Sequence, residues 1–114
     1  MPSLVELFFW LLVGHAVADY ALQSPWMAAA KSKFTPEGKG IWPWVLFMHA
    51  SIHGGMVAYA TGYVWLGVAE IIAHMWIDHA KSEGRLGQGP MAHMRDQYLH
   101  IMCKLVWAFV VIIL

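Results

Sequence analysis

The sequence predicts an all-α membrane protein built as a bundle of four transmembrane helices. Of its 114 residues, 60% are hydrophobic and only 12% are charged, and the mean hydropathy is +0.54. These values are typical of an integral membrane protein rather than a soluble domain. Four segments are apolar over roughly the 20 residues that a helix needs to cross the hydrocarbon. They are residues 4–22, 41–60, 63–80 and 98–114, and we expect them to form a single domain over residues 1–114.

Two polar connections and one tight turn separate these segments. Residues 23–40 and 82–90 contain prolines and glycines and are expected to form loops. Only Thr61 and Gly62 separate the second segment from the third, which predicts an antiparallel hairpin. No lysine or arginine precedes Lys31. The first segment therefore lacks the positive start of a signal peptide, and we expect it to remain in the mature protein.

The basic residues predict the topology. Six of them lie in or beside the two longer loops, namely Lys31, Lys33, Lys39, Lys81, Arg85 and Arg95. By the positive-inside rule both loops are expected to be cytoplasmic, and the two termini and the Thr61-Gly62 turn are expected to face outward. The predicted location is the inner, cytoplasmic membrane of a bacterium.

Ionisable residues recur within the apolar segments at intervals of four. The groups are His15 with Asp19, His49 with His53, Glu70 with His74 and Asp78, and Asp96 with His100. In a helix this interval places the side chains on one face. An ionisable group within a membrane is costly unless it is paired, hydrated or bound to a metal. Since the groups fall at similar depths near the loop side, we expect one polar cluster in the cytoplasmic half of the bundle.

Histidines and carboxylates in this arrangement predict a metal centre. Neutral imidazole and ionised carboxylate suit Zn, Fe or Mn, and helix bundles build such centres from inward-facing side chains. The eight candidate ligands are His15, Asp19, His49, His53, His74, Asp78, Asp96 and His100. A zinc ion takes about four ligands, so we expect a divalent transition metal, zinc first, as two ions or as one ion with a second shell.

A structural explanation competes with this prediction. A lone histidine or aspartate in a transmembrane helix more often forms a hydrogen bond between helices. Four groups at one depth favour a metal or proton-handling centre over purely structural contacts. His79 and His93 are expected to lie outside the cluster, at an interface or in solvent. Lys104 is expected to pair with Glu70, or else to meet an anionic group of a substrate.

Small residues and the single cysteine have simpler interpretations. Gly14, Gly54 and Gly55 are expected to allow close contact between helices. Cys103 excludes both an internal disulfide and a cysteine-based zinc site, and it is expected to be a small buried hydrophobic residue.

The motifs also resemble a known family. They run from Gly14-His15 through Ala18-Asp19, Leu22-Gln23, Trp26-Met27 and Lys31 to His49, His53, His74, Asp78 and Lys81, and end with Asp96-Gln97 and His100. This combination resembles a family of small phage and bacterial membrane proteins classed as a domain of unknown function, over nearly the whole chain. By spacing alone, the His-xxx-Asp pairs are also similar to those of membrane-bound metal-dependent hydrolases, zinc phospholipase C and related nucleases.

The predicted function is metal-dependent hydrolysis of a lipid or lipid-linked phosphate or ester. Glu70 and Asp96 are the catalytic candidates, with Glu70 or an unligated aspartate as general base. Lys31, Lys81 and Arg95 are expected to hold an anionic headgroup at the cytoplasmic mouth. The expected partners are membrane lipid and a lipid-like substrate, and assembly with further copies of the chain is an open alternative. Nucleic acid is not expected, because the loops are short.

Three alternatives stay open at this stage. A non-enzymatic phage-type protein, such as a holin-like pore or a superinfection-exclusion factor with a structural polar or metal core, is compatible with four spans. Haem ligation by opposed histidines is disfavoured by the accompanying carboxylates. A transporter is disfavoured because the sequence has no inverted repeat with broken helices.

Overall fold

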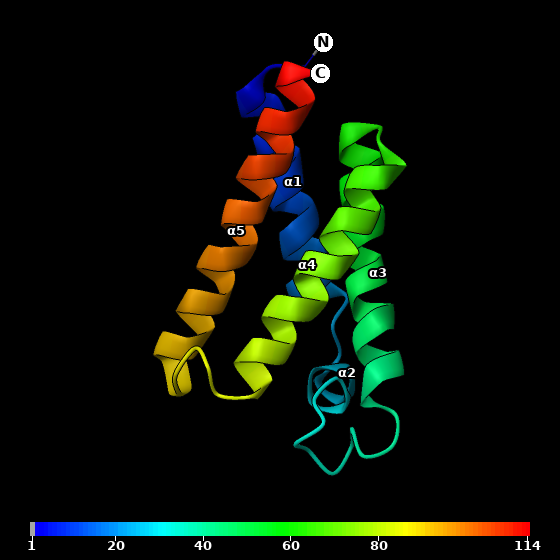
Figure 1. The fold of residues 1–114 in the computed structure, drawn as a ribbon, viewed down its shortest axis with the longest axis vertical. Helices are drawn as coiled ribbons and strands as arrows, with labels where there is room; N and C mark the ends of the chain where they lie inside the picture. The colour runs from blue at the N-terminus through cyan, green and yellow to red at the C-terminus, as the bar shows by residue number, and fades with distance from the viewer. Residues whose placement is uncertain (1) are drawn as a thin grey trace.

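The computed structural model describes residues 2–114, and over these residues the chain is all-helical, without a strand (Figure 1). The elements are α1 (Leu4–Ala16), the π-helix η1 (Val17–Ala21), α2 (Pro25–Ala30), α3 (Trp42–Thr61), α4 (Val64–Ser82) and α5 (Gly89–Ile113). The four long helices run along a molecule with extents of 46 × 26 × 21 Å. Both termini lie at one end, together with the turn between α3 and α4, and the two loops lie at the other. The prediction of an all-α fold is confirmed.

Two proline-containing segments differ from the prediction. α5 begins at Gly89 rather than at residue 98, because Pro90 stands in its first turn, where a missing N–H costs nothing. The segment 23–40 contains α2, a helix with Pro25 at its first position. The Ser24 hydroxyl caps α2 by accepting a hydrogen bond from the Met27 N–H at 3.0 Å. The loop predicted over residues 82–90 agrees with the structure to within two residues, whereas the loop predicted over residues 23–40 is wrong for Pro25–Ala30, since proline also begins helices.

Helices α3 and α4 form the predicted hairpin. Gly62 ends α3 with φ of 79°, a conformation that favours glycine. A Cβ added at Gly54 would lie 2.6 Å from the Gly67 carbonyl oxygen, so the two helices touch backbone to backbone there. A Cβ at Gly14 would lie 3.2 Å from the Met56 Cβ. The close-contact prediction is therefore confirmed for Gly54 and Gly14 and is wrong for Gly55, where a Cβ would meet nothing within 4 Å.

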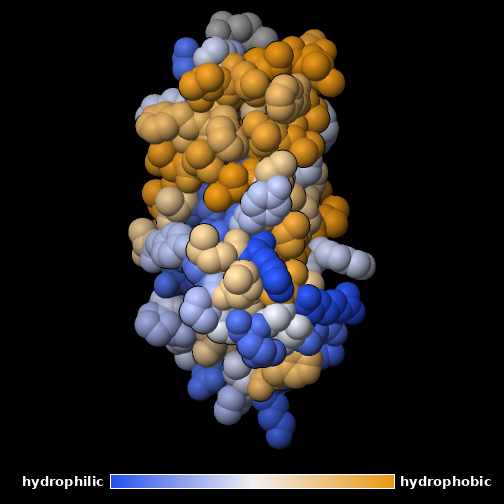
Figure 2. All heavy atoms as spheres, turned by 90° about the vertical axis from the view of Figure 1, so that its left-hand side faces the viewer, coloured by the Kyte–Doolittle hydropathy of each residue, from blue (hydrophilic) through white to orange (hydrophobic). Residues whose placement is uncertain are grey.

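The interior divides into an apolar half and a polar half. Near the termini, Leu7, Leu11, Val57, Leu66 and Val111 pack into an apolar core. Toward the loops, the buried side chains are instead histidines, carboxylates and lysine. The face drawn in Figure 2 follows the same division, because apolar residues cover its half near the termini and hydrophilic residues gather at the loop end.

Two segments are long and apolar enough to cross a membrane, namely Leu4–Ala21 and Gly89–Ile113. By length and composition alone, α3 and α4 do not reach that standard. The structure therefore supports membrane association through α1 with η1 and through α5.

The contact between Gly54 and Gly67 leads to a paired test. Gly54→Ala is expected to destabilise the protein by about 1–3 kcal/mol, because its methyl group overlaps the Gly67 carbonyl. Gly55→Ala makes the same chemical change in open space and is expected to stabilise α3 by up to ~1 kcal/mol. Thermal unfolding of both variants in detergent measures the difference. Equal unfolding temperatures would contradict the close packing.

Candidate metal centre

A local irregularity in the first long apolar segment carries Asp19. After Ala16 the helix widens into η1, where the Leu22 N–H donates to the Val17 carbonyl at 2.9 Å, five residues back. Such π segments occur frequently at functional sites, because the widened turn changes the direction of the side chains that follow it. Asp19 lies at the centre of η1 and points into the bundle, with its side chain only 9% exposed.

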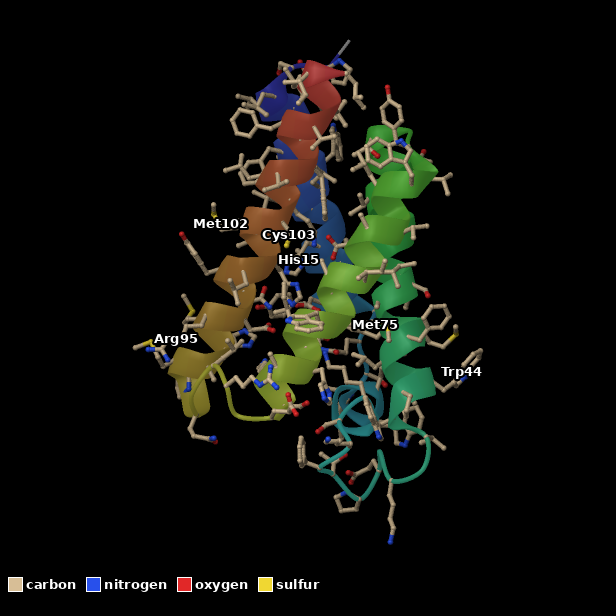
Figure 3. All side chains as sticks on the ribbon, in the orientation of Figure 1. His15, Trp44, Met75, Arg95, Met102 and Cys103 are labelled. Atoms are coloured by element: carbon tan, nitrogen blue, oxygen red, sulfur yellow. The ribbon has the colours of Figure 1, made fainter. Side chains whose placement is uncertain are left out.

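Three imidazoles and one amide surround the Asp19 carboxylate. Its Oδ1 lies 3.1 Å from His53 Nε2 and 3.2 Å from His49 Nε2, both on α3. Its Oδ2 accepts a hydrogen bond of 2.8 Å from the Gln97 amide on α5 and lies 3.5 Å from His15 Nε2. Side chains from α1, η1, α3 and α5 therefore meet at this one carboxylate. Figure 3 shows His15 within the bundle, whereas Trp44, Arg95 and Met102 point away from it.

The Asp78 carboxylate on α4 contacts both the histidines of the cluster and a residue of the first loop. Its Oδ2 lies 3.3 Å from His74 Nε2 and 3.6 Å from His49 Nε2, and it accepts a hydrogen bond of 2.9 Å from Lys31 Nζ. Its Oδ1 accepts from His100 Nε2 at 3.1 Å. Asp78 therefore contacts imidazoles of α3, α4 and α5 and a lysine of the first loop.

Asp96 on α5 completes the cluster. Its Oδ1 lies 3.2 Å from His100 Nε2, and its Oδ2 lies 3.7 Å from Lys81 Nζ. The Gln97 side chain is shared, because its Nε2 also donates to Asp96 Oδ2 at 3.1 Å while its Oε1 lies 2.9 Å from His15 Nε2. Gln97 thus fixes the positions of two carboxylates and one imidazole.

Glu70 has a different surrounding. Its Oε1 lies 2.8 Å from Lys104 Nζ and accepts a hydrogen bond of 2.9 Å from the Trp107 indole N–H, and its Oε2 lies 3.2 Å from His74 Nδ1. The predicted pairing of Lys104 with Glu70 is confirmed. A carboxylate bound to the Nδ1–H of a histidine fixes the ring so that Nε2 is the free ligand nitrogen. Here that Nε2 faces the main cluster.

The imidazoles of the cluster lie against one another in the core. Ring centroids are 3.8 Å apart for His53 and His74 and 4.1 Å apart for His74 and His100. All three rings are at most 1% exposed. Such density is unusual for groups that each require hydrogen-bond partners.

Several ligand atoms are close to each other without being hydrogen-bonded. His49 Nε2, His74 Nε2 and Asp96 Oδ1 are buried and have no hydrogen-bond partner within residues 2–114, although each lies 3.2–3.3 Å from an imidazole nitrogen or a carboxylate oxygen of another candidate ligand. A buried polar atom left unsatisfied costs about 1–3 kcal/mol. Two ligands of a tetrahedral zinc ion, each about 2.0–2.1 Å from it, lie roughly 3.3 Å apart, and their lone pairs point at the ion. The 3.2 Å distances from His49 Nε2 to Asp19 Oδ1 and from Asp96 Oδ1 to His100 Nε2 match that geometry.

Two sets of residues could each hold an ion. The first ligand group, as we call it, consists of Asp19, His49, His53 and His74, and the second ligand group consists of Asp78, Asp96 and His100. Within each group one ligand atom per residue lies within 4.8 Å of the others. Glu70, His74 and His100 satisfy the same distance test. Because Glu70 Oε2 contacts His74 Nδ1, we interpret the role of Glu70 in that third set as orienting the His74 ring.

Not every predicted residue joins a ligand group. His15 is in none of them, and its Nε2 lies closer to Gln97 Oε1, at 2.9 Å, than to its predicted partner Asp19, at 3.5 Å. His79 stacks on Trp42 with ring centroids 5.1 Å apart, and His93 lies 3.0 Å from the Tyr20 hydroxyl, both outside the ligand groups as expected. The structure adds Gln97 and Lys31 to the cluster. Gln97 was missed because it lies about 100° around the helix from Asp96.

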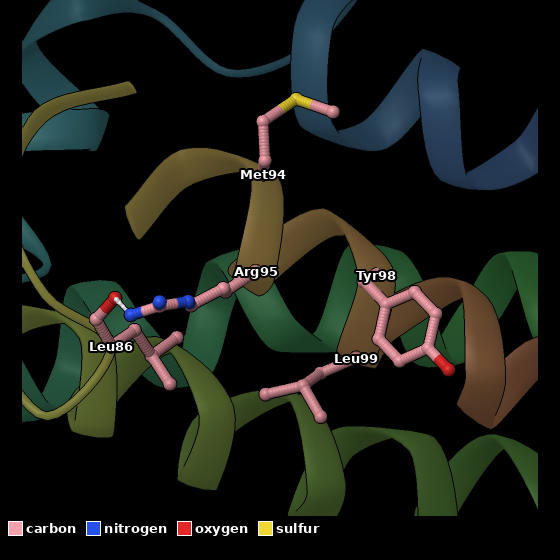
Figure 4. Close-up of a pocket in the computed structure, with 5 residues that line it drawn as sticks. All are labelled: Leu86, Met94, Arg95, Tyr98 and Leu99. Carbon is pink, nitrogen blue, oxygen red and sulfur yellow. Dashed lines mark hydrogen bonds between the residues drawn. The ribbon is translucent and has the colours of Figure 1, made fainter. Parts of the chain in front are cut away.

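The three basic residues predicted at the cytoplasmic mouth of the bundle lie in two different places. Lys31 and Lys81 line one cavity of about 240 Å³ together with Asp78. Arg95 donates a hydrogen bond to the Leu86 carbonyl at 3.1 Å and lines a different, mostly apolar hollow with Tyr98 and Leu99 (Figure 4). The prediction that all three residues share one anion site is wrong for Arg95, because its guanidinium is engaged by the loop before α5.

Comparison with known protein families assigns the chain to one of them. It belongs to the family described as "Protein of unknown function (DUF3307)", whose model matches residues 7–114. No match was found among curated proteins or among solved structures. The membership confirms the unknown-function family that the motifs indicated. Since the family's description assigns no activity, function has to be argued from the site.

The buried pair of Lys104 and Glu70 gives a stability test. Lys104→Met is expected to cost about 3–5 kcal/mol, because it leaves the Glu70 carboxylate buried without its lysine. Adding Glu70→Gln removes that charge and is expected to restore part of the loss. Denaturant unfolding in detergent measures both variants, with the exposed Lys39→Met as control. If Lys104→Met alone unfolds like the parent protein, the pairing is wrong.

Proposed function

We propose that this chain is a four-span membrane protein of the bacterial inner membrane that binds one or two divalent transition metal ions, zinc first, and hydrolyses a phosphate or ester bond of a lipid or lipid-linked substrate. The first ligand group supplies a full set of four ligands, as in closed zinc sites. The second supplies three, which leaves one position for water or substrate.

One observation carries the proposal. His49 Nε2 lies 3.2 Å from Asp19 Oδ1, and Asp96 Oδ1 lies 3.2 Å from His100 Nε2, each pair within one ligand group, and both His49 Nε2 and Asp96 Oδ1 still lack hydrogen bonds to any of residues 2–114. A purely structural polar core would align donors with acceptors, since unsatisfied buried groups are costly. Ligands of a shared cation have no such requirement, because they point at the ion. Nδ1 of His15, His49, His53 and His100 also has no protein partner in the described chain, and it would need ordered water.

Four spans rather than two are supported by the outer surface of α4. On α4, Val64, Val68, Ile72 and Trp76 repeat at intervals of four, and each is at least half exposed. The polar residues of the same helix, Glu70, His74 and Asp78, are buried. The average hydropathy of α4 is lowered by residues that face inward, so its outward face still suits lipid.

The proposed reaction divides its tasks among the cluster residues. A divalent ion, when bound, would lower the pKa of its bound water, to about 7 in known zinc enzymes, and would polarise the bond to be cleaved. Asp78 and Asp96 hold the second position next to the cavity, and an Asp96 oxygen not engaged by the ion is the candidate base. Glu70, held by Lys104, Trp107 and His74, is better suited to orienting His74 than to the general-base role predicted from the sequence.

Metal content is the first test of this proposal. Elemental analysis of the purified protein is expected to find one or two equivalents of a transition metal per chain. His53→Ala and Asp78→Ala are each expected to lower that content, because each removes a ligand. His79→Gln is the matched control, since His79 stacks on Trp42 outside the ligand groups. A metal-free parent protein, or equal loss in the control, would overturn the proposal.

Turnover is tested separately in vesicles. With metal-loaded protein, release of phosphate or headgroup from a phospholipid is expected, and Asp96→Asn is expected to slow it by roughly 100-fold or more. Activity that survives both chelation and Asp96→Asn contradicts the hydrolase assignment. Dye leakage without any hydrolysis would support the holin-like alternative instead.

The four-span topology is tested by single cysteines in a Cys103→Ala background. A membrane-impermeant maleimide is expected to label Thr61→Cys in spheroplasts, because the turn between α3 and α4 faces outward. Lys39→Cys is expected to react only after the membrane is opened, because its loop lies at the other end of the bundle (Figure 1). Labelling of both positions from outside would rule out this arrangement.

A further inference from the structure

We propose that the cavity between α2 and α4 binds a phosphate group, and that it does so only when the adjacent centre holds its metal. This inference rests on the proposed function and names the substrate group of the same site. The cavity has a volume of about 240 Å³ and is lined by Ala28, Lys31, Ser32, Asp78, Lys81 and Ser82. Two lysines and two serines around one opening are donors suited to an anion.

The hydroxyls of the cavity are not equivalent. Ser82 Oγ donates to the His79 carbonyl at 2.8 Å, so its proton is already used. Ser32 Oγ accepts a hydrogen bond of 3.2 Å from the Phe34 N–H, which leaves the Ser32 proton free to donate. Lys31, Lys81 and Ser32 are therefore the donors that we assign to the phosphate oxygens.

The charges of the cavity explain its dependence on metal. Lys31 lies 2.9 Å from Asp78, and Lys81 lies 3.7 Å from Asp96, so two positive charges face two negative ones. An anion gains little from this balanced set. A divalent ion held by Asp78, Asp96 and His100 compensates the two carboxylates, and the lysines then provide the excess positive charge.

The volume of the cavity limits what it can enclose. Pockets that enclose a whole drug-sized ligand measure about 300–1,000 Å³. A cavity of about 240 Å³ accommodates a phosphate headgroup with water but not a long apolar substituent. The remainder of a lipid-linked molecule would stay outside it, whereas free phosphate would fit entirely. Both sources share the same recognised chemistry.

Calorimetric titration tests the inference on metal-loaded protein in phosphatidylcholine nanodiscs, with inorganic phosphate as the probe. Phosphate is expected to bind to the parent protein and to lose binding after chelation. Lys81→Gln is expected to weaken binding by roughly 10-fold or more, and Ser32→Ala by about 3-fold, at unchanged metal content. Lys33→Gln is the matched control, because it removes the same charge from the loop that carries Ser32 but lies outside the cavity.

A second arm repeats the titration in nanodiscs that contain phosphatidic acid. Competition by that lipid identifies a lipid headgroup as the ligand, and the absence of competition identifies free phosphate; either result supports the subsite. Normal metal content without phosphate binding overturns the subsite and leaves the metal centre standing. Phosphate affinity that is unaffected by chelation, or equally weakened by Lys33→Gln, also overturns it. A metal-free parent protein removes both proposals.

Discussion

Four carboxylates buried among apolar helices have to be matched by positive charge, and the rest of this structure is organised around that requirement. Lysines contact three of them, since Lys31 contacts Asp78, Lys81 contacts Asp96 and Lys104 contacts Glu70. For Asp19, the contacts recorded over residues 2–114 are with His15, His49, His53 and Gln97, and none is with lysine or arginine. A metal cation, a proton on a neighbouring imidazole or a proton on the carboxyl group itself can compensate Asp19, because neutral imidazole carries no charge.

The backbone features of the fold bring these groups together. The π segment η1 directs Asp19 into the bundle, and the Gly54–Gly67 contact holds α3 against α4, so that His53 and His74 stack at 3.8 Å. The short helix α2 carries Lys31 back over Asp78 at the loop end. Each feature serves the polar half of the molecule, whereas the apolar core near the termini needs only close packing.

Helical spacing was enough to predict much of this arrangement. The all-α fold, the α3–α4 hairpin and the pairing of Lys104 with Glu70 follow from periodicity and from the cost of burying charge. These features depend on neighbours one turn apart or on the composition of whole segments. The same reasoning placed Gly54 at a helix contact but could not distinguish it from Gly55, because that choice depends on the partner helix.

The features that were missed depend on tertiary structure. Gln97 lies on a different face of α5 from Asp96, yet it contacts Asp19, Asp96 and His15. Lys31 reaches Asp78 through a loop whose path no periodicity predicts. His15 remains 3.5 Å from Asp19, as the spacing predicts, but its hydrogen-bond partner is the Gln97 amide oxygen at 2.9 Å, which lies on another helix. Spacing identifies which residues face inward, and the helix contacts decide which of them meet.

X-ray absorption spectroscopy at the metal edge of the purified protein would show whether histidines and an aspartate share an ion. We expect a coordination shell of nitrogen and oxygen at about 2.0–2.1 Å with the outer-shell scattering of several imidazoles, as three histidines and one aspartate require. An absent edge, or a shell of oxygen alone without imidazole scattering, would contradict it. In that case a proton on a neighbouring imidazole or on the carboxyl group itself would be the remaining compensation for Asp19.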